Sequence, residues 1–164
     1  FVLEFIALKP TADSLAVIPL SNPFQTDAYA YARDVLMGAS MPKFERAKCV
    51  LSPDSVQFYI SGTAAIRGQR EVDNSDIESQ TLVTIENIKN LLSRENLSRR
   101  GIEISIDASD MPFLRVYVKR AEDITKVRAI CENYFKNANI LYLVADICRG
   151  HLLVEIEGYA NVKR

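Results

Sequence analysis

Residues 140–144 (ILYLV) restrict the possible folds of this chain more than any other segment. Five consecutive apolar residues in an extended strand put apolar side chains on both of its faces, so both faces need to be covered. The two helices predicted below can cover only one face of a sheet of about six strands. The other face needs the N-terminal segment, a further part of the protein, or another subunit. We favour threefold self-association.

Strands are predicted where short apolar or alternating runs end at turn residues. Residues 1–8 (FVLEFIAL) are apolar enough for a buried strand, and a second strand is expected at 15–20. Residues 46–51 and 56–61 form a predicted hairpin, and Gly62 ends its second strand. The remaining predictions are an irregular link at 63–70 and strands at 102–106, 113–118, 140–145 and 152–160.

The clearest predicted helix begins near residue 76 and is amphipathic. Ser75 and Glu78 form a capping box, and Asp76 adds negative charge at the positive end of the helix dipole. Arginines near its end and then Gly101 indicate where it stops. A second helix is expected over residues 121–135. The predicted buried faces comprise Ile77, Thr81, Ile85, Ile88 and Leu92 in the first helix and Ile124, Val127, Cys131 and Tyr134 in the second.

These elements predict an α+β fold, in which two helices pack on one face of a mixed sheet of about six strands. Residues 1–45 are expected to supply N-terminal strands and an ordered loop rich in aromatic side chains, and residues 46–164 the α+β domain. Because the chain begins at Phe1, in an apparent strand, we expect it to be a piece of a longer protein.

Composition argues against several classes of function. A net charge of −1 gives no general electrostatic grip on nucleic acid, and no apolar run is long enough to span a membrane. One histidine and three widely spaced cysteines predict neither a metal site nor a disulfide framework. We therefore expect a cytoplasmic protein without a cofactor, which binds a small molecule.

The strongest chemical signal lies in residues 145–158 (ADICRGHLLVEIEG). Glu155 is a carboxylate on an otherwise apolar strand, so it needs a partner or carries a raised pKa. Cys148 is expected at the end of the neighbouring strand, in the same polar corner, and His151 in a solvated turn. Arg149 is a candidate for binding a ligand carboxylate or for a structural ion pair. From these residues alone, Glu155 is either an acid or a structural side chain paired with an arginine at a subunit boundary.

The element order and two motifs resemble the Rid family (YjgF type, also called L-PSP endoribonucleases) over residues 47–160. The motifs are residues 59–62 (YISG) and 154–158 (VEIEG). The resemblance implies the fold of the small trimeric chorismate mutase and a homotrimer with ligand clefts between its subunits.

A closer resemblance, from residue 21 onward, is to the C-terminal half of chorismatases. It implies hydrolysis of chorismate, a carboxylated enol ether, to pyruvate and a dihydroxylated or hydroxybenzoate product. It makes Glu155 the catalytic acid and places Cys148 in the substrate pocket. The chemistry of the residues adds predicted ligand contacts for Tyr29, Tyr31, Ser61, Gly62, Thr63 and Arg149. The segments that carry the resemblance are residues 22–25 (NPFQ), 28–31 (AYAY), 44–47 (FERA), 60–68 (ISGTAAIRG), Gln80, 87–88 (NI), 145–149 (ADICR) and 152–155 (LLVE).

The chain departs from the chorismatase pattern at two positions, since Gln69 stands where a histidine is usual and Ala32 where a proline is usual. Chorismatases also have an N-terminal half that contributes to the site. The alternative is therefore a non-catalytic ligand-binding or interaction domain. Imine deamination is disfavoured because Ile140 occupies the position of the arginine that binds the substrate carboxylate in those Rid members. Ribonuclease activity fits poorly with an acidic chain that has one histidine.

Overall fold

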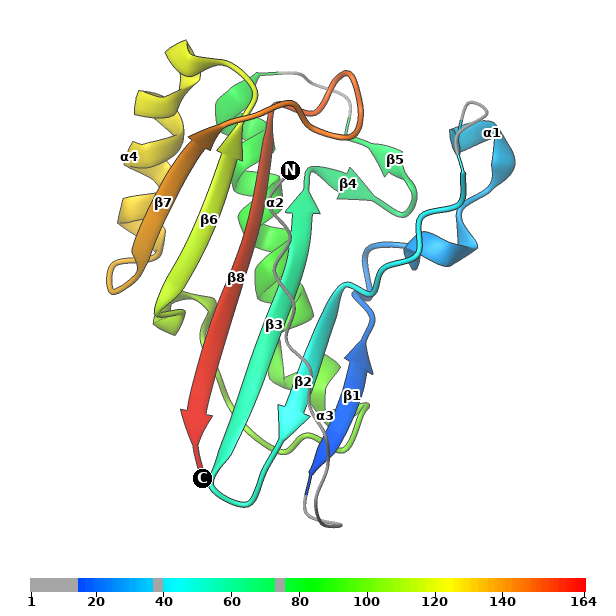
Figure 1. The fold of residues 1–164 in the computed structure, drawn as a ribbon, viewed down its shortest axis with the longest axis vertical. Coiled ribbons are helices and arrows are strands. Elements are labelled where there is room, and N and C mark those ends of the chain that lie inside the picture. Colours follow the sequence, from blue (N-terminus) through cyan, green and yellow to red (C-terminus); the bar gives the residue numbers. More distant parts are fainter. Residues whose placement is uncertain (1–14, 37–39, 73–75) are drawn as a thin grey trace.

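The structure is a computed structural model that describes residues 15–36, 40–72 and 76–164 (Figure 1). The strand predicted at residues 1–8, and Ser75 of the predicted capping box, lie outside the described residues. Within them, one sheet of six strands forms the body of the chain. Its strands, in spatial order, are β1 (Ala16–Leu20), β2 (Ala47–Leu51), β3 (Ser55–Ala64), β8 (Val154–Lys163), β6 (Phe113–Val118) and β7 (Asn139–Val144).

The sheet is mixed, because β6 and β7 are parallel while all other neighbouring strands are antiparallel. Two helices, α2 (Ile77–Leu91) and α4 (Ile124–Tyr134), lie on the same face of the sheet (Figure 1). This confirms the predicted α+β architecture. The smaller elements are α1 (Arg33–Leu36), α3 (Arg94–Ser98), the hairpin β4 (Ile66–Arg67) and β5 (Arg70–Glu71), and 3₁₀ turns at Ala28–Ala30, Ala108–Asp110 and Ala121–Asp123.

The main core lies between the helices and the sheet, and its residues follow the predicted periodicities. In β8, Val154 and Ile156 are fully buried, and Val116 of β6 is buried beside them. The predicted face of the first helix is buried at Ile85 and Ile88, which pack into the same cluster. Burial of one residue in two along the strands, and of one stripe on each helix, removes most of the apolar surface from water.

Two helical boundaries differ from the prediction. The first helix ends at Leu91, because the Ser93 hydroxyl caps a separate helix, α3, by accepting a hydrogen bond from the Asn96 amide at 3.3 Å. Gly101, at φ +71°, follows α3 instead of α2. At the start of α2, Asp76 is the N-cap and accepts from the Ser79 amide at 2.9 Å.

Three strand predictions also need correction. Residues 102–106 alternate in burial as predicted, but they form no strand, since no strand in the described part of the chain pairs with them. Strand β3 continues past Gly62 to Ala64. The segment read as an irregular link contains the hairpin β4–β5, whose turn has Gly68 at φ +57°.

Strands β7 and β8 are not neighbours, because β6 lies between them. The chain leaves β7 at Val144 and crosses the end of β6 before it enters β8 at Val154 (Figure 1). Cys148 therefore lies in this connecting loop, and its predicted position on a strand end next to β8 is wrong. The loop nevertheless brings Cys148 to the same end of the sheet as Glu155.

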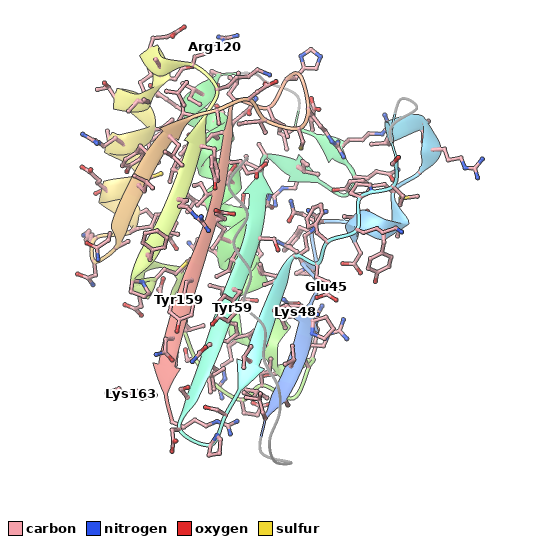
Figure 2. The ribbon with its side chains drawn as sticks, viewed as in Figure 1. Glu45, Lys48, Tyr59, Arg120, Tyr159 and Lys163 are labelled. Atoms are coloured by element: carbon pink, nitrogen blue, oxygen red, sulfur yellow. The ribbon has the colours of Figure 1, made fainter. Side chains whose placement is uncertain are left out.

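The sheet face opposite the helices carries aromatic and apolar side chains. Figure 2 shows Tyr59 and Tyr159 side by side on β3 and β8, with ring centroids 5.2 Å apart. On the same face Phe113 is 40% exposed and Leu141 48% exposed. The apolar side chains of β7 are thus covered on one side only by the described part of the chain.

Candidate active site

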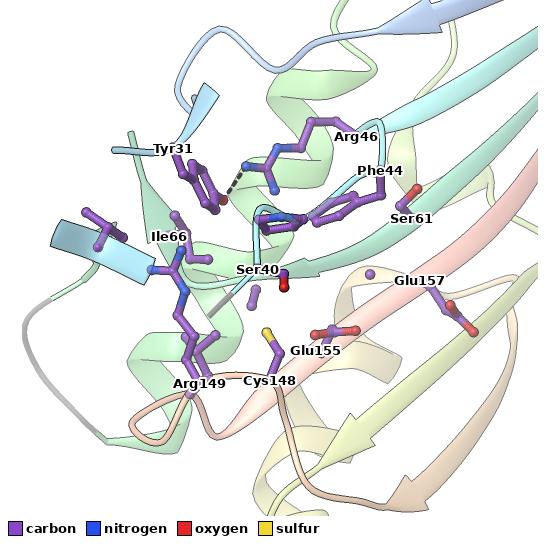
Figure 3. Close-up of a pocket in the computed structure, with 15 residues that line it drawn as sticks. Tyr31, Ser40, Phe44, Arg46, Ser61, Ile66, Cys148, Arg149, Glu155 and Glu157 are labelled. Carbon is purple, nitrogen blue, oxygen red and sulfur yellow. Dashed lines mark hydrogen bonds between the residues drawn. The ribbon is translucent and has the colours of Figure 1, made fainter. Parts of the chain in front are cut away.

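A cavity of about 600 Å³ lies at one end of the sheet, between the aromatic loop, the end of β3, the start of β8 and the loop that precedes β8 (Figure 3). Its walls are apolar with a few polar groups, which is the usual composition of small-molecule sites. The lining residues are Tyr31, Val35, Ser40, Pro42, Phe44, Arg46, Ser61, Gly62, Ala64, Ile66, Cys148, Arg149, Leu152, Glu155 and Glu157.

Glu155 is the second residue of β8, and its side chain lies on the cavity wall (Figure 3). Burial, together with the negative charge of Glu157, raises the pKa of the Glu155 carboxyl above its ordinary value. No basic side chain among the described residues forms an ion pair with Glu155. Burial therefore favours the protonated form of this carboxyl, and the alternative role, pairing with an arginine of another subunit, stays a prediction.

Gly62 makes room for the Glu155 carboxyl. The register of β3 against β8 shifts between Ile60 and Thr63, which takes Ser61 and Gly62 out of the regular ladder. A Cβ at position 62 would lie 2.1 Å from Oε1 of Glu155, far inside van der Waals contact. Glycine therefore leaves the space that the carboxyl occupies, and its backbone angles do not call for glycine.

Gln80 of α2 holds the end of the loop that carries Cys148 and Arg149. The Gln80 amide donates to the His151 carbonyl at 2.9 Å and accepts from the Leu153 amide at 2.8 Å, so it fixes both sides of the loop end. Gln80 is buried, and a buried amide that satisfies both its donor and its acceptor roles gives a well-defined backbone position.

Cys148 is a poor nucleophile in this position. Partial burial, and then the Glu155 carboxylate, raises the pKa of its thiol, so the thiol stays protonated near neutral pH. The residue is exposed on the cavity wall (Figure 3), where it can contact a ligand.

Two guanidinium groups pack against the ring of Tyr31. The Arg46 guanidinium lies 5.7 Å from the ring centroid and that of Arg149 lies 5.1 Å from it. Arg46 also donates to the Tyr31 hydroxyl at 2.6 Å (Figure 3), and Arg149 donates to the Gln69 carbonyl at 2.9 Å. Both residues line the cavity, so two positive charges share it with the Glu155 carboxyl.

Arg46 is almost completely buried, at 3% exposure, and its Nε has no hydrogen-bond partner among the described residues. A buried guanidinium with an unused donor is costly unless something accepts from it. In a cavity of this size, the group that accepts from Nε can belong to a ligand.

Comparison with known proteins identifies the relatives of this chain. No family model matches it. It is 38% identical over 146 residues to a 3-hydroxybenzoate synthase of Streptomyces hygroscopicus, over 86% of this chain and 42% of that protein. A crystal structure of chorismatase superposes with a TM-score of 0.82 at 35% identity, over 88% of this chain and 43% of that one. This chain is similar to chorismatases in both sequence and fold.

The fold is shared more widely than the sequence. A Rid-family protein of unknown function, YyfA from Yersinia pestis, matches over 90% of this chain and all of its own length, with a TM-score of 0.57 at 20% identity. At that identity only the fold is shared. This chorismatase-like chain spans about 42% of the length of the curated relative it matches.

The two departures from the chorismatase pattern, Ala32 and Gln69, lie in contact in this chorismatase-like chain. The Ala32 amide donates to the Gln69 side-chain oxygen at 2.8 Å. Proline has no amide hydrogen, so a proline at position 32 could not make this bond. The bond keeps the aromatic loop beside Gln69, whose carbonyl accepts from Arg149.

Six of the eight residues predicted for the site line the one cavity: Tyr31, Ser61, Gly62, Cys148, Arg149 and Glu155. Tyr29 is 59% exposed and lines a shallower adjoining groove with Lys43 and Lys48. Thr63 is buried, and its hydroxyl donates to the Ser61 carbonyl at 2.9 Å. The roles given to these residues in ligand binding stay predictions.

Arg46 and Glu157 line the cavity but were missed in the sequence. Arg46 directly precedes the apolar strand β2 and lies two residues after Phe44. The signal available in the sequence was this position of a cation next to an aromatic side chain. The only signal for Glu157 in the sequence was its position two residues after Glu155, on the same face of an alternating strand. Within the described residues no cluster of histidine, cysteine and carboxylate side chains could hold a metal ion, and no helix is long and apolar enough to cross a membrane.

Proposed function

We propose that this chain hydrolyses chorismate or a similar carboxylated enol ether, with Glu155 as general acid. The observation that carries the proposal is the Glu155 carboxyl, which faces the cavity without an ion-pair partner in the described residues and has a pKa raised by burial. A carboxylic acid kept protonated near neutral pH can deliver a proton to a weakly basic carbon. The similarity to a 3-hydroxybenzoate synthase and to chorismatase supports the choice of substrate.

The reaction uses one proton and one water. Glu155 transfers its proton to the methylene carbon of the enol ether, and the ether carbon becomes an oxocarbenium ion. Water adds to that carbon and returns a proton to the Glu155 carboxylate. The resulting hemiketal breaks its bond to the ring oxygen, which gives pyruvate and the ring alcohol. A hydroxybenzoate forms when the ring product also loses water.

Arg46 and Arg149 are the proposed carboxylate-binding residues. Guanidinium groups bind carboxylates through paired N–H donors, and both groups lie on the cavity wall against the same tyrosine ring. Two such groups suit a substrate with two carboxylates. The stacking on Tyr31 fixes their planes before the ligand arrives, which reduces the entropy lost on binding.

The direct test is incubation of the protein with chorismate while pyruvate release is followed by a coupled assay. We expect pyruvate to appear in proportion to protein concentration, together with one aromatic or cyclohexadiene product. Calorimetry with chorismate distinguishes the alternative, a binding domain without catalysis. Binding without pyruvate release would assign the cavity to ligand recognition alone, and neither binding nor release would reject the proposal.

We also propose that the chain works as a homotrimer in a reducing compartment such as the cytoplasm. The half-exposed apolar side chains on the open face of the sheet support the trimer, because contiguous apolar surface of this kind is usually covered by a partner. The free state of Cys49, Cys131 and Cys148 supports the compartment.

The trimer predicts a large effect of Leu141→Arg. Leu141 is 48% exposed on the open face, so arginine there fits the folded chain, but it would place a charge inside the subunit contact. We expect light scattering to find a trimer for the parent protein and a monomer for the variant. Leu82→Arg is the matched control, since Leu82 is 57% exposed on α2. A monomeric parent, or a trimer that tolerates Leu141→Arg, would contradict the proposal.

A further inference from the structure

A second carboxylate, Glu157, lies on the cavity wall two residues after Glu155. The two side chains share one face of β8, where such residues lie about 7 Å apart along the strand. On the neighbouring strand β6, Arg115 is paired with Glu157 and Tyr117 with Glu155. The two carboxyl groups thus share a cavity but have different neighbours.

One oxygen of Glu157 is held by an ion pair and by a hydrogen bond. Nε of Arg115 lies 2.5 Å from Oε1 of Glu157, and the Tyr117 hydroxyl donates to that oxygen at 2.7 Å. Burial, followed by the bond to Glu157, raises the pKa of Tyr117 to about 12, so its proton remains available for this bond. Arginine is always charged. Both partners therefore fix the position of the Glu157 carboxyl group.

We propose that Glu157, fixed by Arg115 and Tyr117, is a positioning residue. It holds a negative charge beside Glu155 and thereby favours the protonated form of the Glu155 carboxyl. The inference rests on the proposed function, in which Glu155 must be protonated to act. Two carboxyl groups whose surroundings favour opposite protonation states are the usual means of dividing acid and base roles within one site. Here the division comes from the register of β6 against β8.

The sign of the effect follows from all the charges around Glu155. A negative charge nearby makes ionisation of Glu155 harder, whereas the positive charges make it easier. The negative charge of Glu157 adds to the effect of burial in raising the pKa of Glu155. Removing it takes this contribution away, so Glu155 should ionise at lower pH. The ionisable groups facing Glu155 from the packed elements are Glu157 on β8, Arg115 and Tyr117 on β6, Arg46 on the aromatic-loop side, and Cys148 and Arg149 on the loop before β8.

The test is a carboxyl ¹³C NMR titration of the protein labelled at glutamate, with the Glu155 signal assigned by its loss in Glu155→Gln. In the parent protein we expect the Glu157 signal to report an ionised carboxylate at a pH where Glu155 is still protonated. In Glu157→Gln the Glu155 titration should move to lower pH. Glu157→Asp, which keeps the charge, should leave it near its position in the parent. Glu95→Gln is the matched control, because it removes a carboxylate from an exposed ion pair with Arg99 on α3.

An unchanged Glu155 titration in folded Glu157→Gln would overturn the proposal, and so would a parent protein in which Glu157 loses its proton after Glu155. The second outcome needs no variant, so the test survives if Glu157→Gln fails to fold. Activity separates this inference from the proposed function. If chorismate is turned over, the high-pH limb of the rate profile should move to lower pH in Glu157→Gln. If the parent releases no pyruvate, the reaction is wrong, while the NMR result still decides the role of Glu157.

Discussion

Replacing Glu155 with glutamine should lower the turnover of chorismate by about 10²–10⁴-fold, which is the usual contribution of general acid catalysis. Glutamine keeps the size and the hydrogen-bonding reach of the side chain but has no carboxylic proton to transfer. The loss should appear in kcat, with KM little changed, because the groups proposed to bind the substrate carboxylates remain. Steady-state pyruvate release by Glu155→Gln and by Glu122→Gln, whose side chain is exposed, measures the effect against a matched change.

The same variant should be more stable than its parent at neutral pH. Since the folded pKa of Glu155 is raised above its ordinary value, the folded state prefers the protonated form. That preference contributes stability fully below the ordinary pKa, and the contribution is lost as the pH rises through the folded pKa. Glutamine has no such loss. We expect the melting temperature of Glu155→Gln to exceed that of the parent near pH 8, and the difference to shrink as the pH is lowered.

The opposite result has a clear meaning. If Glu155 is paired with an arginine of another subunit, removing its charge leaves a buried cation without a partner and costs several kcal/mol, roughly 3–5 by comparison with other buried pairs. A variant that melts earlier, dissociates in light scattering and retains the parent's turnover would assign Glu155 to the subunit contact. Melting temperature, oligomeric state and turnover should therefore be measured on one preparation.

The fold was predictable where a periodic pattern coincided with a partner to pack against. Phe113–Val118 was predicted as a strand and is β6, and the predicted apolar face of α2 is the buried one. Residues 102–106 show the limit of this reasoning. Their alternation is real, but a strand also needs a backbone ladder, and alternation contains no information about which segments lie beside it. In the same way, periodicity could not show that β6 separates β7 from β8.

The candidate site was predictable only through local motifs and the family resemblance. Glu155 and Cys148 lie seven residues apart, and their position in a polar corner of an apolar segment was visible in the sequence. Arg46 is more than a hundred residues away, and it reaches the cavity because the aromatic loop folds against the β3 end of the sheet. The partners of Glu157 depend on the register of β6 against β8, which no spacing along the chain reveals.

Replacing Gly62 with alanine should abolish most of the activity, on the order of 10²-fold, while leaving the fold intact. The added Cβ would stand 2.1 Å from Oε1 and 2.7 Å from Cδ of Glu155, so the carboxyl must move. A glutamate side chain can rotate at modest cost in free energy, but misplacement of a reacting group by about 1 Å can cost 10²-fold in rate. We expect a large loss in kcat for Gly62→Ala, with a melting temperature close to that of the parent.

Gly158→Ala is the control. Its added methyl group would fill space in the core, whereas that of Gly62→Ala would fill the space of the Glu155 carboxyl. A Cβ at Gly158 would lie 2.3 Å from Met111 Cε, 2.5 Å from Leu114 Cδ2 and 3.1 Å from the Phe113 carbonyl oxygen. Met111 and Leu114 are fully buried, and the backbone oxygen cannot move without disturbing the β6–β8 ladder. This overpacking should cost about 1–3 kcal/mol of unfolding free energy. The expected result is a cross-over, in which Gly62→Ala is stable and nearly inactive and Gly158→Ala is destabilised but active while folded. If Gly62→Ala retained full turnover, the position of the Glu155 carboxyl would not matter to the reaction, and its role as the acid would fail with it.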